Sequence, residues 1–502
     1  MFARTTTYTR RLLDGFQTAL HGPTGHSMLG RIFKAYDIRG TYPDLLNDAM
    51  AWQIGYGASK YLLADAAAAG DTTPMMHNIV VGRDMRQSSP SLTKQLIQGI
   101  NDQGGEVIDL GMCDTSMIYF AVNHLDCAGG VMVTASHNPP NYNGFKISKR
   151  NAKPVGEATG LAEIRKHAAM VDKATLVKQN GRTEPRDLWS AYSKHVRSFL
   201  DWPNGAKLKV VIDASNGMAG TMIPKIFGKG SALGPVPGLT IVEVNFDNTK
   251  GVFAHEPNPL VAANLRQVQE AVLAEKADLG VCYDGDADRC VIIDEKGRAV
   301  GCDHLTALFA KHFLATNPGA AVVYDLRSTK AVAEEITKAG GKPVRGRVGH
   351  VFLKQAMAEQ GGIVGGELSG HFYFRDNYNA DSGVISMCVV LSILAKSGKS
   401  MSQLIAPLAR YPQSGEINFS IEDKDGALAW VRKEYGSPSR GATIDELDGV
   451  TVDCFAKHGW WCNIRKSNTE PLLRLNLEAR DEATLQRMMA EISPRLGKKV
   501  DH

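Results

Sequence analysis

Three aspartates at alternate positions, Asp284, Asp286 and Asp288, have the clearest chemical potential in this sequence. Carboxylate oxygens at this spacing can point at one hard cation, and Mg²⁺ prefers oxygen ligands that it shares with a phosphate. Three anions this close repel one another unless a cation neutralises them. Arg289 follows directly and adds positive charge for a second anion. The run therefore predicts a divalent-cation site next to a site for an anion.

Two other interpretations of this run are an EF-hand loop and a solvated acidic turn. An EF-hand requires a glycine at the sixth loop position, where this chain has Arg289, and a helix before the loop, where residues 279–283 (LGVCY) predict a strand. We therefore reject the EF-hand. The acidic turn fits less well than a cation site, because the run lies between two apolar strands.

A candidate nucleophile, Ser136, lies in residues 134–140 (TASHNPP), directly after an apolar strand. In open parallel sheets ligands collect at the carboxyl ends of strands, so this position suits a site. A serine hydroxyl is a weak nucleophile unless another group activates it or it is already phosphorylated. By itself the run fits a surface turn better, because Ser, Asn and Pro are common turn residues.

Two further loops combine polar groups with tight turns. In residues 365–371 (GGELSGH), Glu367 and Ser369 can bind sugar hydroxyls and His371 can donate to an oxygen or carry a proton. A glycine-rich turn explains this run equally well.

Residues 465–471 (RKSNTEP) offer a guanidinium, hydroxyls, an amide and backbone N–H groups, which together could cradle a phosphate. A capped turn is the equal alternative.

Two cations lie in the first part of the chain: Arg39, in residues 36–40 (YDIRG), and Lys146, in residues 143–146 (NGFK). Either could stabilise a phosphoryl group during transfer. A single Arg or Lys is more often only solvated, so these residues gain meaning only from the other motifs.

The elements that must position these residues alternate between apolar strands and helical patterns. A helix is expected over residues 89–103, and strands are expected over residues 78–82, 106–110, 131–134, 207–213, 279–283 and 320–324. Strands separated by helices imply mainly parallel sheets that are buried on both faces. We therefore expect an N-terminal extension (1–27) and three α/β blocks (28–180, 181–298 and 299–411). Residues 412–502 predict an α+β domain, with antiparallel strands over 416–421, 450–455, 460–464 and 472–478 and a closing helix over 483–496.

Composition limits the function classes. The chain has 502 residues, a net charge of +4 and no long basic run, so nucleic acid is not expected as a partner. No apolar run is long enough to cross a bilayer. The eight cysteines show no CxxC spacing and lie mostly in apolar stretches, which predicts buried free thiols in a reducing cytosol. The first residues resemble an organelle transit peptide weakly and fit an extension of a cytoplasmic enzyme better.

Taken together and in this order, the motifs resemble the α-D-phosphohexomutase superfamily, and within it the phosphomannomutase/phosphoglucomutase group, from about residue 30 to the end. The resemblance implies three similar α/β domains with mixed, mostly parallel sheets and a C-terminal α+β domain, arranged around a central cleft. It implies reversible interconversion of hexose 1-phosphate and hexose 6-phosphate, with mannose, glucose or both as the sugar. The implied intermediates are a phosphoserine enzyme and a hexose 1,6-bisphosphate, and one Mg²⁺ serves each active site.

The resemblance also assigns roles residue by residue. Ser136 matches the phosphoserine, and its oxygen joins Asp284, Asp286 and Asp288 as a Mg²⁺ ligand. The other matched positions surround the reacting group or the sugar phosphate. Around the phosphoserine and metal loop these are Arg39, His137, Lys146 and Arg289; His350 lies near the sugar; the substrate contacts are Tyr36, Arg327, Glu367, Ser369, His371, Arg465, Ser467, Asn468 and Thr469.

The sequence departs from the family pattern at a few positions. Arg327 stands where many relatives carry a lysine, which keeps the charge but not the compact geometry. Residues 302–304 (CDH) and 114–116 (DTS) replace a Pro-Asp-Arg run and a Pro-Thr-Pro-like run. These differences bear on the preferred sugar. The general base stays open among His371, His350 and Lys146.

Three alternative functions remain. A phosphoglucosamine mutase is one, although residues 467–471 (SNTEP) resemble the mannose and glucose enzymes more. A metal-dependent sugar phosphatase would use an aspartate among residues 284–288 as nucleophile. A catalytically silent phosphosugar-binding protein would not need Ser136 and all three aspartates. We expect a cytoplasmic enzyme for a small phosphosugar, monomeric or homodimeric, without nucleic-acid or membrane partners.

Overall fold

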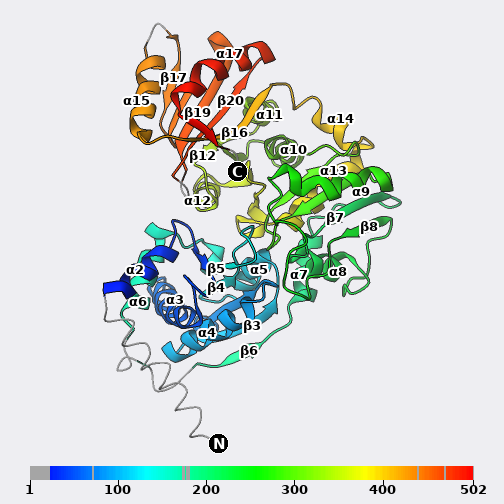
Figure 1. Cartoon of the computed structure of the whole chain (residues 1–502). Helices are drawn as coiled ribbons and strands as arrows, with labels where there is room; N and C mark the ends of the chain where they lie inside the picture. Colours follow the sequence, from blue (N-terminus) through cyan, green and yellow to red (C-terminus); the bar gives the residue numbers. More distant parts are fainter. Residues whose placement is uncertain are drawn as a thin grey trace, which may run out of the picture. The chain divides into compact units, whose positions relative to one another are not determined.

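A computed structural model describes residues 23–70, 73–171, 176, 181–437, 440–467 and 471–500 (Figure 1). The chain divides into two compact units. The first comprises Met1–Ala299 with Asp376–Gly398, and the second comprises Val300–Arg375 with Lys399–His502. Most of the predicted N-terminal extension lies outside the described residues. Among the described residues, no helix combines the length and apolar composition that a bilayer crossing requires.

The first sheet of the first unit has the strand order β1-β5-β4-β2-β3-β6. Strands β4, β2, β3 and β6 run parallel, whereas β5 is antiparallel to both β4 and β1. The bounds are β1 (Ile38–Thr41), β2 (Asn78–Arg83), β3 (Glu106–Met112), β4 (Gly129–Val133), β5 (Tyr142–Lys149) and β6 (Thr183–Pro185).

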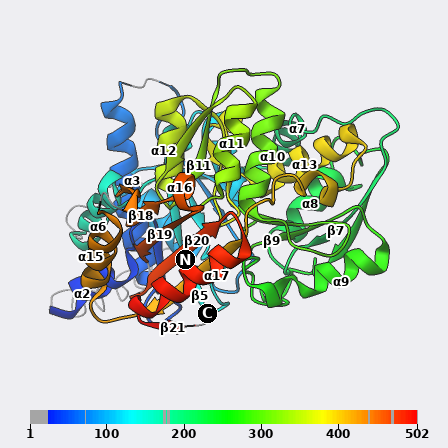
Figure 2. The same ribbon diagram turned by 90° about the horizontal axis from the view of Figure 1, so that it is seen from above.

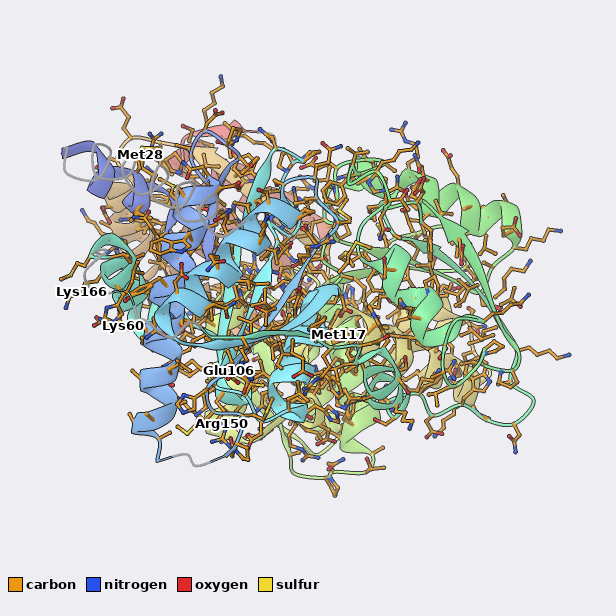
Figure 3. All side chains as sticks on the ribbon, turned by 90° about the horizontal axis from the view of Figure 1, so that it is seen from below. Met28, Lys60, Glu106, Met117, Arg150 and Lys166 are labelled. Atoms are coloured by element: carbon orange, nitrogen blue, oxygen red, sulfur yellow. The ribbon has the colours of Figure 1, made fainter. Side chains whose placement is uncertain are left out.

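Helices cover this sheet. Their bounds are α2 (Pro23–Ile32), α3 (Asp48–Ala68), α4 (Ser89–Gln103), α5 (Thr115–His124) and α6 (Leu161–Ala169). The next helix, α7 (Trp189–Arg197), packs against α5. Helices α3 and α4 approach closely, because a Cβ atom on Gly55 would lie 2.1 Å from the Leu96 carbonyl oxygen and one on Gly99 would lie 2.0 Å from that of Trp52. Figure 3 shows Lys60 of α3 and Lys166 of α6 on the outside of this unit.

The second sheet of the first unit has the order β10-β9-β7-β8, with β8, β7 and β9 parallel and β10 antiparallel to β9. Helix α9 packs along β7 and β9 (Figure 2), and α13 packs against α7 and β10. The bounds are β7 (Leu208–Asp213), β8 (Leu239–Val244), β9 (Leu279–Tyr283), β10 (Cys290–Ile293), α8 (Ala219–Phe227), α9 (Arg266–Glu275) and α13 (Gly383–Ser397). The short strand β15 (Ala380–Asp381), which precedes α13, is not part of this sheet. Helix α13 therefore belongs to the first unit, although its residues follow the first part of the second unit in the chain.

The second unit begins with a sheet in which β12, β11 and β13 run parallel and β14 is antiparallel to β13. Helix α10 packs against α11 and β13, and α12 packs against all three parallel strands. The bounds are β11 (Ala321–Asp325), β12 (Lys342–Gly346), β13 (Gly362–Gly366), β14 (Phe372–Phe374), α10 (Cys302–Leu314), α11 (Lys330–Lys338), α12 (His350–Gln360) and α14 (Met401–Ile405).

The C-terminal part of the second unit is a sheet of order β17-β18-β19-β20-β16-β21, antiparallel throughout. One face is apolar: alternate residues of β18, β19 and β20 join residues of α15 and α17 in a single buried cluster. The bounds are β16 (Gln413–Ser420), β17 (Thr443–Asp445), β18 (Val450–Asp453), β19 (Trp460–Lys466), β20 (Leu473–Ala479), β21 (Lys498–Val500), α15 (Lys424–Tyr435), α16 (Phe455–His458) and α17 (Glu482–Ile492). The opposite face is polar.

The predicted strands and the mixed α/β architecture are confirmed, and so is the antiparallel C-terminal domain. The closing helix is shorter than predicted: α17 ends at Ile492 and a 3₁₀ turn follows over Ser493–Arg495, because Pro494 has no N–H to continue the helix. Strand β18 ends at Asp453, two residues early, since α16 begins at Phe455. All eight cysteines lie among the described residues as buried free thiols, as predicted.

Candidate active site

Ser136 lies against the aspartate loop. It follows β4, and its Oγ donates a hydrogen bond of 2.8 Å to Oδ2 of Asp284, which directly follows β9. Ser136 is fully buried and has a φ of 50°, in the left-handed region that L-residues seldom adopt. A Cβ atom on Gly285 would lie 2.4 Å from the Ser136 carbonyl oxygen, so only glycine permits this approach. The two loops that the sequence singled out are thus joined at the carboxyl ends of strands from two sheets.

The three aspartates converge as predicted. Each offers one carboxylate oxygen, and these oxygens lie within 4.8 Å of one another in buried surroundings. Burial and the neighbouring carboxylates of Asp288 and Asp286 raise the pKa of Asp284 well above its ordinary value. Oδ1 of Asp286 is buried without a hydrogen-bond partner among the described residues. Three clustered carboxylates with an unsatisfied buried oxygen are the donor set of a divalent-cation site, so these residues fit a bound metal.

Lys146, on β5, supplies positive charge to the same cluster. Its Nζ donates to Asp286 Oδ2 at 2.7 Å and to Asp288 Oδ2 at 2.5 Å. Burial alone would lower the pKa of Lys146, but the surrounding carboxylates outweigh it and the pKa is raised. Lys146 is therefore held as a cation.

Other cations lie around the serine. The backbone N–H of Arg289 donates to Asp284 Oδ1 at 3.2 Å, and its Nε lies 3.7 Å from Asp284 Oδ2. Arg39 on β1 donates to the side chains of Asp37 and Asn138, the latter within the serine loop. Tyr36 lies in the bend before β1 and is half-buried. The arrangement favours an anionic group at Ser136.

The ring of His137 lies beside the serine oxygen, with its Nδ1 3.4 Å from Ser136 Oγ. Loss of hydration and then the positive charges of Arg289, Arg39 and Lys146 hold its pKa well below the ordinary value. His137 is therefore neutral at physiological pH.

In the second unit, three loops meet at one edge of the third sheet. They follow the parallel strands β11, β12 and β13 and carry Arg327, His350 and residues 367–371, respectively. The rings of His350 and His371 lie 6.2 Å apart between centroids. The backbone N–H of Leu368 lies 3.4 Å from Asp325 Oδ2. Because the carboxyl ends of parallel strands share one edge of a sheet, these predicted residues lie close together.

The side chains of the loop over residues 367–371 form a connected network. Ser369 Oγ lies 2.9 Å from His371 Nδ1 and 3.3 Å from Glu367 Oε2, while the Tyr373 hydroxyl donates to Glu367 Oε1. Glu367 and His371 are buried, and Ser369 is half-buried. Carboxylate, hydroxyl and imidazole groups in this arrangement can bind vicinal hydroxyls of a sugar.

Glu416 on β16 pairs with three arginines of the second unit. Its carboxylate accepts from Arg327 Nη1 at 2.7 Å, from Arg465 Nη2 at 3.0 Å and from Arg474 Nη1 at 3.0 Å. Burial opposes ionisation of Glu416, but the three guanidinium groups outweigh it and hold its pKa well below the ordinary value. Arg465 and Arg474 face each other across β19 and β20, on the polar face of the sheet.

The loop over residues 465–471, which the sequence predicts to hold a phosphate, is described only in part. Arg465 is 2 % exposed, and its Nε is buried without a hydrogen-bond partner among the described residues. Ser467 follows β19 and is half-buried. Asn468 and Thr469 lie outside the described residues.

Family models match nearly the whole chain. They describe the phosphoglucomutase/phosphomannomutase α/β/α domains I, II and III, at residues 30–175, 190–297 and 302–411, and the C-terminal domain, at residues 416–494. The chain belongs to the phosphoglucomutase/phosphomannomutase family, within the α-D-phosphohexomutase superfamily.

Named relatives of this phosphohexomutase agree with the models. Phosphohexose mutases of Xanthomonas campestris pv. campestris are 40 % identical over 464 residues, covering 92 % of this chain and 98 % of theirs. Phosphomannomutase of Escherichia coli K12 is 37 % identical over 460 residues, covering 90 % of this chain and 96 % of its own.

Solved structures show the same fold. A phosphoglucomutase/phosphomannomutase family protein from Burkholderia thailandensis has a TM-score of 0.80 at 29 % identity, covering 93 % of this chain and 96 % of its own. A putative phosphomannomutase from Thermus thermophilus has a TM-score of 0.73 at 21 % identity, covering 92 % of this chain and 98 % of its own, and shares the fold.

Sequence reasoning missed several residues of this phosphohexomutase site. Thr115, at the start of α5, donates from Oγ1 to Asp286 Oδ2 at 2.6 Å and from its N–H to the Asp286 carbonyl at 3.1 Å. Arg86, after β2, donates to the backbone of the serine loop. For Glu416 the sequence predicts only a place in a strand. An arginine shortly after an apolar strand carries no local signal for its partner, since these contacts span about fifty residues or more.

Proposed function

We propose that this phosphohexomutase interconverts hexose 1-phosphate and hexose 6-phosphate through phosphorylated Ser136, with mannose, glucose or both as the sugar. The observation that carries the proposal is the 2.8 Å hydrogen bond from Ser136 Oγ to Asp284, within a cluster of three convergent aspartates. The nucleophile and the cation ligands that a phosphoryl transfer needs are therefore in contact.

Asp284, Asp286 and Asp288, with an oxygen of Ser136 or its phosphate, are the residues that would hold Mg²⁺. A bound Mg²⁺ would neutralise charge on the transferring phosphoryl group. Thr115 and Lys146 already hold Asp286 from two sides, which presets the direction of its carboxylate. The buried, unsatisfied Asp286 Oδ1 supports this assignment.

In the forward half-reaction, the bond between phosphorus and Ser136 Oγ breaks as a bond forms from phosphorus to the free hydroxyl oxygen of the substrate. The substrate hydroxyl loses its proton to a base, and the Ser136 oxygen regains one when its bond breaks. The resulting hexose 1,6-bisphosphate reorients and returns its other phosphoryl group to Ser136. The same bisphosphate, added in trace amounts, would phosphorylate the free enzyme.

Lys146 Nζ donates to Asp286 and Asp288 and would place positive charge beside the transferring phosphoryl group. His371, His350 and Lys146 all stay candidates for the base. Arg39, Arg289 and the neutral His137 would contact the phosphoryl group on Ser136, together with Tyr36 near the sugar.

Other predicted residues would bind the rest of the substrate. Glu367, Ser369 and His371 would contact sugar hydroxyls. Arg465, Ser467, Asn468 and Thr469 would hold the phosphate that is not reacting, and Arg327 would add positive charge near it. Three arginines of this cluster share two carboxylates, because Arg327 also pairs with Asp325. The group therefore retains net positive charge, which supports this role.

A coupled assay with mannose 1-phosphate and glucose 1-phosphate, with Mg²⁺ and a trace of the matching 1,6-bisphosphate, tests the proposal. We expect turnover of at least one substrate and an enzyme that carries acid-stable phosphoserine. Release of inorganic phosphate with an acid-labile acylphosphate would instead identify the sugar phosphatase. Turnover of glucosamine 6-phosphate alone would identify a phosphoglucosamine mutase, and no turnover of any of these would indicate a binding protein.

The expected setting is the cytoplasm, which eight buried free thiols support. A monomer or homodimer that acts on a small phosphosugar, without nucleic acid or membrane partners, stays our prediction for its assembly. Sedimentation of the purified protein would distinguish the two states.

A further inference from the structure

One fully buried guanidinium holds the loop that carries Ser136. Arg86 Nη2 donates to the carbonyl oxygens of Ser136 at 2.9 Å and Asn138 at 2.7 Å. Its Nη1 donates to those of Pro139 at 2.6 Å and Tyr142 at 3.1 Å. A single side chain therefore fixes four carbonyls within one short stretch of backbone.

Asp84 binds the same guanidinium group through the Nε of Arg86. Its carboxylate accepts from Arg86 Nε at 3.0 Å and from Thr134 Oγ1 at 2.8 Å, and Thr134 Oγ1 in turn accepts the Ser136 N–H at 2.9 Å. All five guanidinium N–H groups of Arg86 thus have partners. Both backbone polar groups of Ser136 are fixed by this one network, which holds the serine in its left-handed conformation.

Arg86 also reaches toward the aspartate loop. Its guanidinium stacks on the ring of Phe253 at 4.8 Å from the ring centroid. The same ring lies against the metal loop, which is the aspartate loop over residues 284–288, because a Cβ atom on Gly285 would be 3.0 Å from Phe253 Cζ. Gln87 Nε2 donates to the Lys250 carbonyl at 3.1 Å and secures the segment before Phe253. Arg86 and Phe253 together therefore link the loop that carries Ser136 with the metal loop.

We propose that Arg86, with Asp84 and Phe253, is a positioning residue that sets the Ser136 oxygen against the metal loop for phosphoryl transfer. This inference rests on the proposed function. The mutase must both give and recover a phosphoryl group at one oxygen, and small misplacements of reacting atoms cost large factors in rate. A buried charge costs more than an apolar side chain of similar size, so packing alone does not account for Arg86.

Arg86→Lys tests the inference, because a lysine keeps the charge but cannot serve four carbonyls with a planar fork. We expect kcat to fall about 10- to 100-fold while KM for the hexose phosphate stays within about threefold, since Arg86 positions the serine and does not bind the sugar. Single-turnover transfer from phosphoserine to hexose phosphate should slow by the same factor as kcat.

Two controls separate positioning from stability. Arg298→Lys changes an exposed arginine of the same unit that pairs with Asp294, and it should leave kcat unchanged. Ile212→Val, a buried change in β7, should lower the unfolding temperature without slowing single-turnover transfer. A folded Arg86→Lys enzyme with wild-type kcat and transfer rate would overturn the inference.

If Arg86→Lys does not fold, Thr134→Val decides the question, because it removes the acceptor of the Ser136 N–H and leaves Arg86 in place. Reduced kcat with unchanged KM supports the positioning network, and wild-type kcat overturns it. Failure of the proposed function is distinguishable, since it would appear as a wild-type enzyme that forms no acid-stable phosphoserine.

Discussion

Ser136 and Asp284 lie 148 residues apart in the chain, yet Ser136 Oγ donates to Asp284 Oδ2 over 2.8 Å. The contact joins two sheets of the same compact unit at the carboxyl ends of their strands. It places the hydroxyl that would carry the phosphoryl group directly on a carboxylate that would bind the metal.

Ser136→Ala should reduce mutase turnover by at least about a thousandfold, because it removes the oxygen that accepts and returns the phosphoryl group. Stopped and continuous assays of hexose 1-phosphate conversion measure this, and intact mass should show no added phosphate. Ser193→Ala, at another buried serine of the same unit, is the matched control and should keep full turnover. Near-normal activity of Ser136→Ala would remove the serine from its role.

Chelation of divalent cations should abolish turnover, and Mg²⁺ should restore it. Asp286→Asn should raise the Mg²⁺ concentration for half-maximal activity by about tenfold or more, because one ligand loses its charge while Lys146 remains beside it. A Mg²⁺ titration of activity measures the shift. Asp201→Asn, at an exposed aspartate paired with Lys396, should titrate like the wild type. Full activity in the presence of excess chelator would contradict the metal assignment.

Much of this site could be predicted from the sequence, because its signals are local. The aspartates alternate after an apolar strand, Ser136 follows another, and the loop over residues 367–371 follows a third. The rule that ligands collect at the carboxyl ends of parallel strands then groups residues that share a sheet. Register alternation also explains why Arg465 and Arg474 share the polar face opposite the α15 and α17 cluster.

The residues that hold the loops of the site in place could not be predicted, because their hydrogen-bond partners lie far along the chain. Nothing near Arg86 indicates that it binds four carbonyls between residues 136 and 142, and nothing near Thr115 indicates Asp286. Strand β21, with the sequence Lys-Lys-Val, lacks an apolar pattern and forms by pairing with β16 at the sheet edge. Helix α13 is apolar nearly throughout, so its pattern does not reveal that it packs with the first unit.

Arg465→Ala should raise KM for the hexose phosphate by roughly 10- to 100-fold with a smaller effect on kcat, since it removes charge-assisted hydrogen bonds of about 1.5–3 kcal/mol to the bound phosphate. Initial-rate kinetics over a range of substrate concentrations separate the two constants. Lys466→Ala is the matched control, because the neighbouring lysine is exposed and pairs with Asp425. An unchanged KM in Arg465→Ala would refute the phosphate-binding role.

The stability that Glu416 contributes should depend on pH. The folded-state pKa of Glu416 is held below its usual value by Arg327, Arg465 and Arg474, against the effect of burial. A depressed carboxyl pKa contributes stability that is fully present above the unfolded-state pKa, about 4.3, and is lost as the pH falls below it. Glu416→Gln should therefore lower the unfolding temperature by several degrees at neutral pH, because three guanidinium groups would surround a neutral amide.

Between about pH 5 and pH 3, the difference in unfolding temperature between the wild type and Glu416→Gln should narrow, because only the wild type carries a carboxylate that can be protonated. Thermal unfolding followed by circular dichroism at a series of pH values measures this. Glu422→Gln, at an exposed glutamate of the same unit, should show a small difference that varies little over this range. If the difference in unfolding temperature between the wild type and Glu416→Gln stays constant with pH, the ionised carboxylate of Glu416 does not hold the three arginines together.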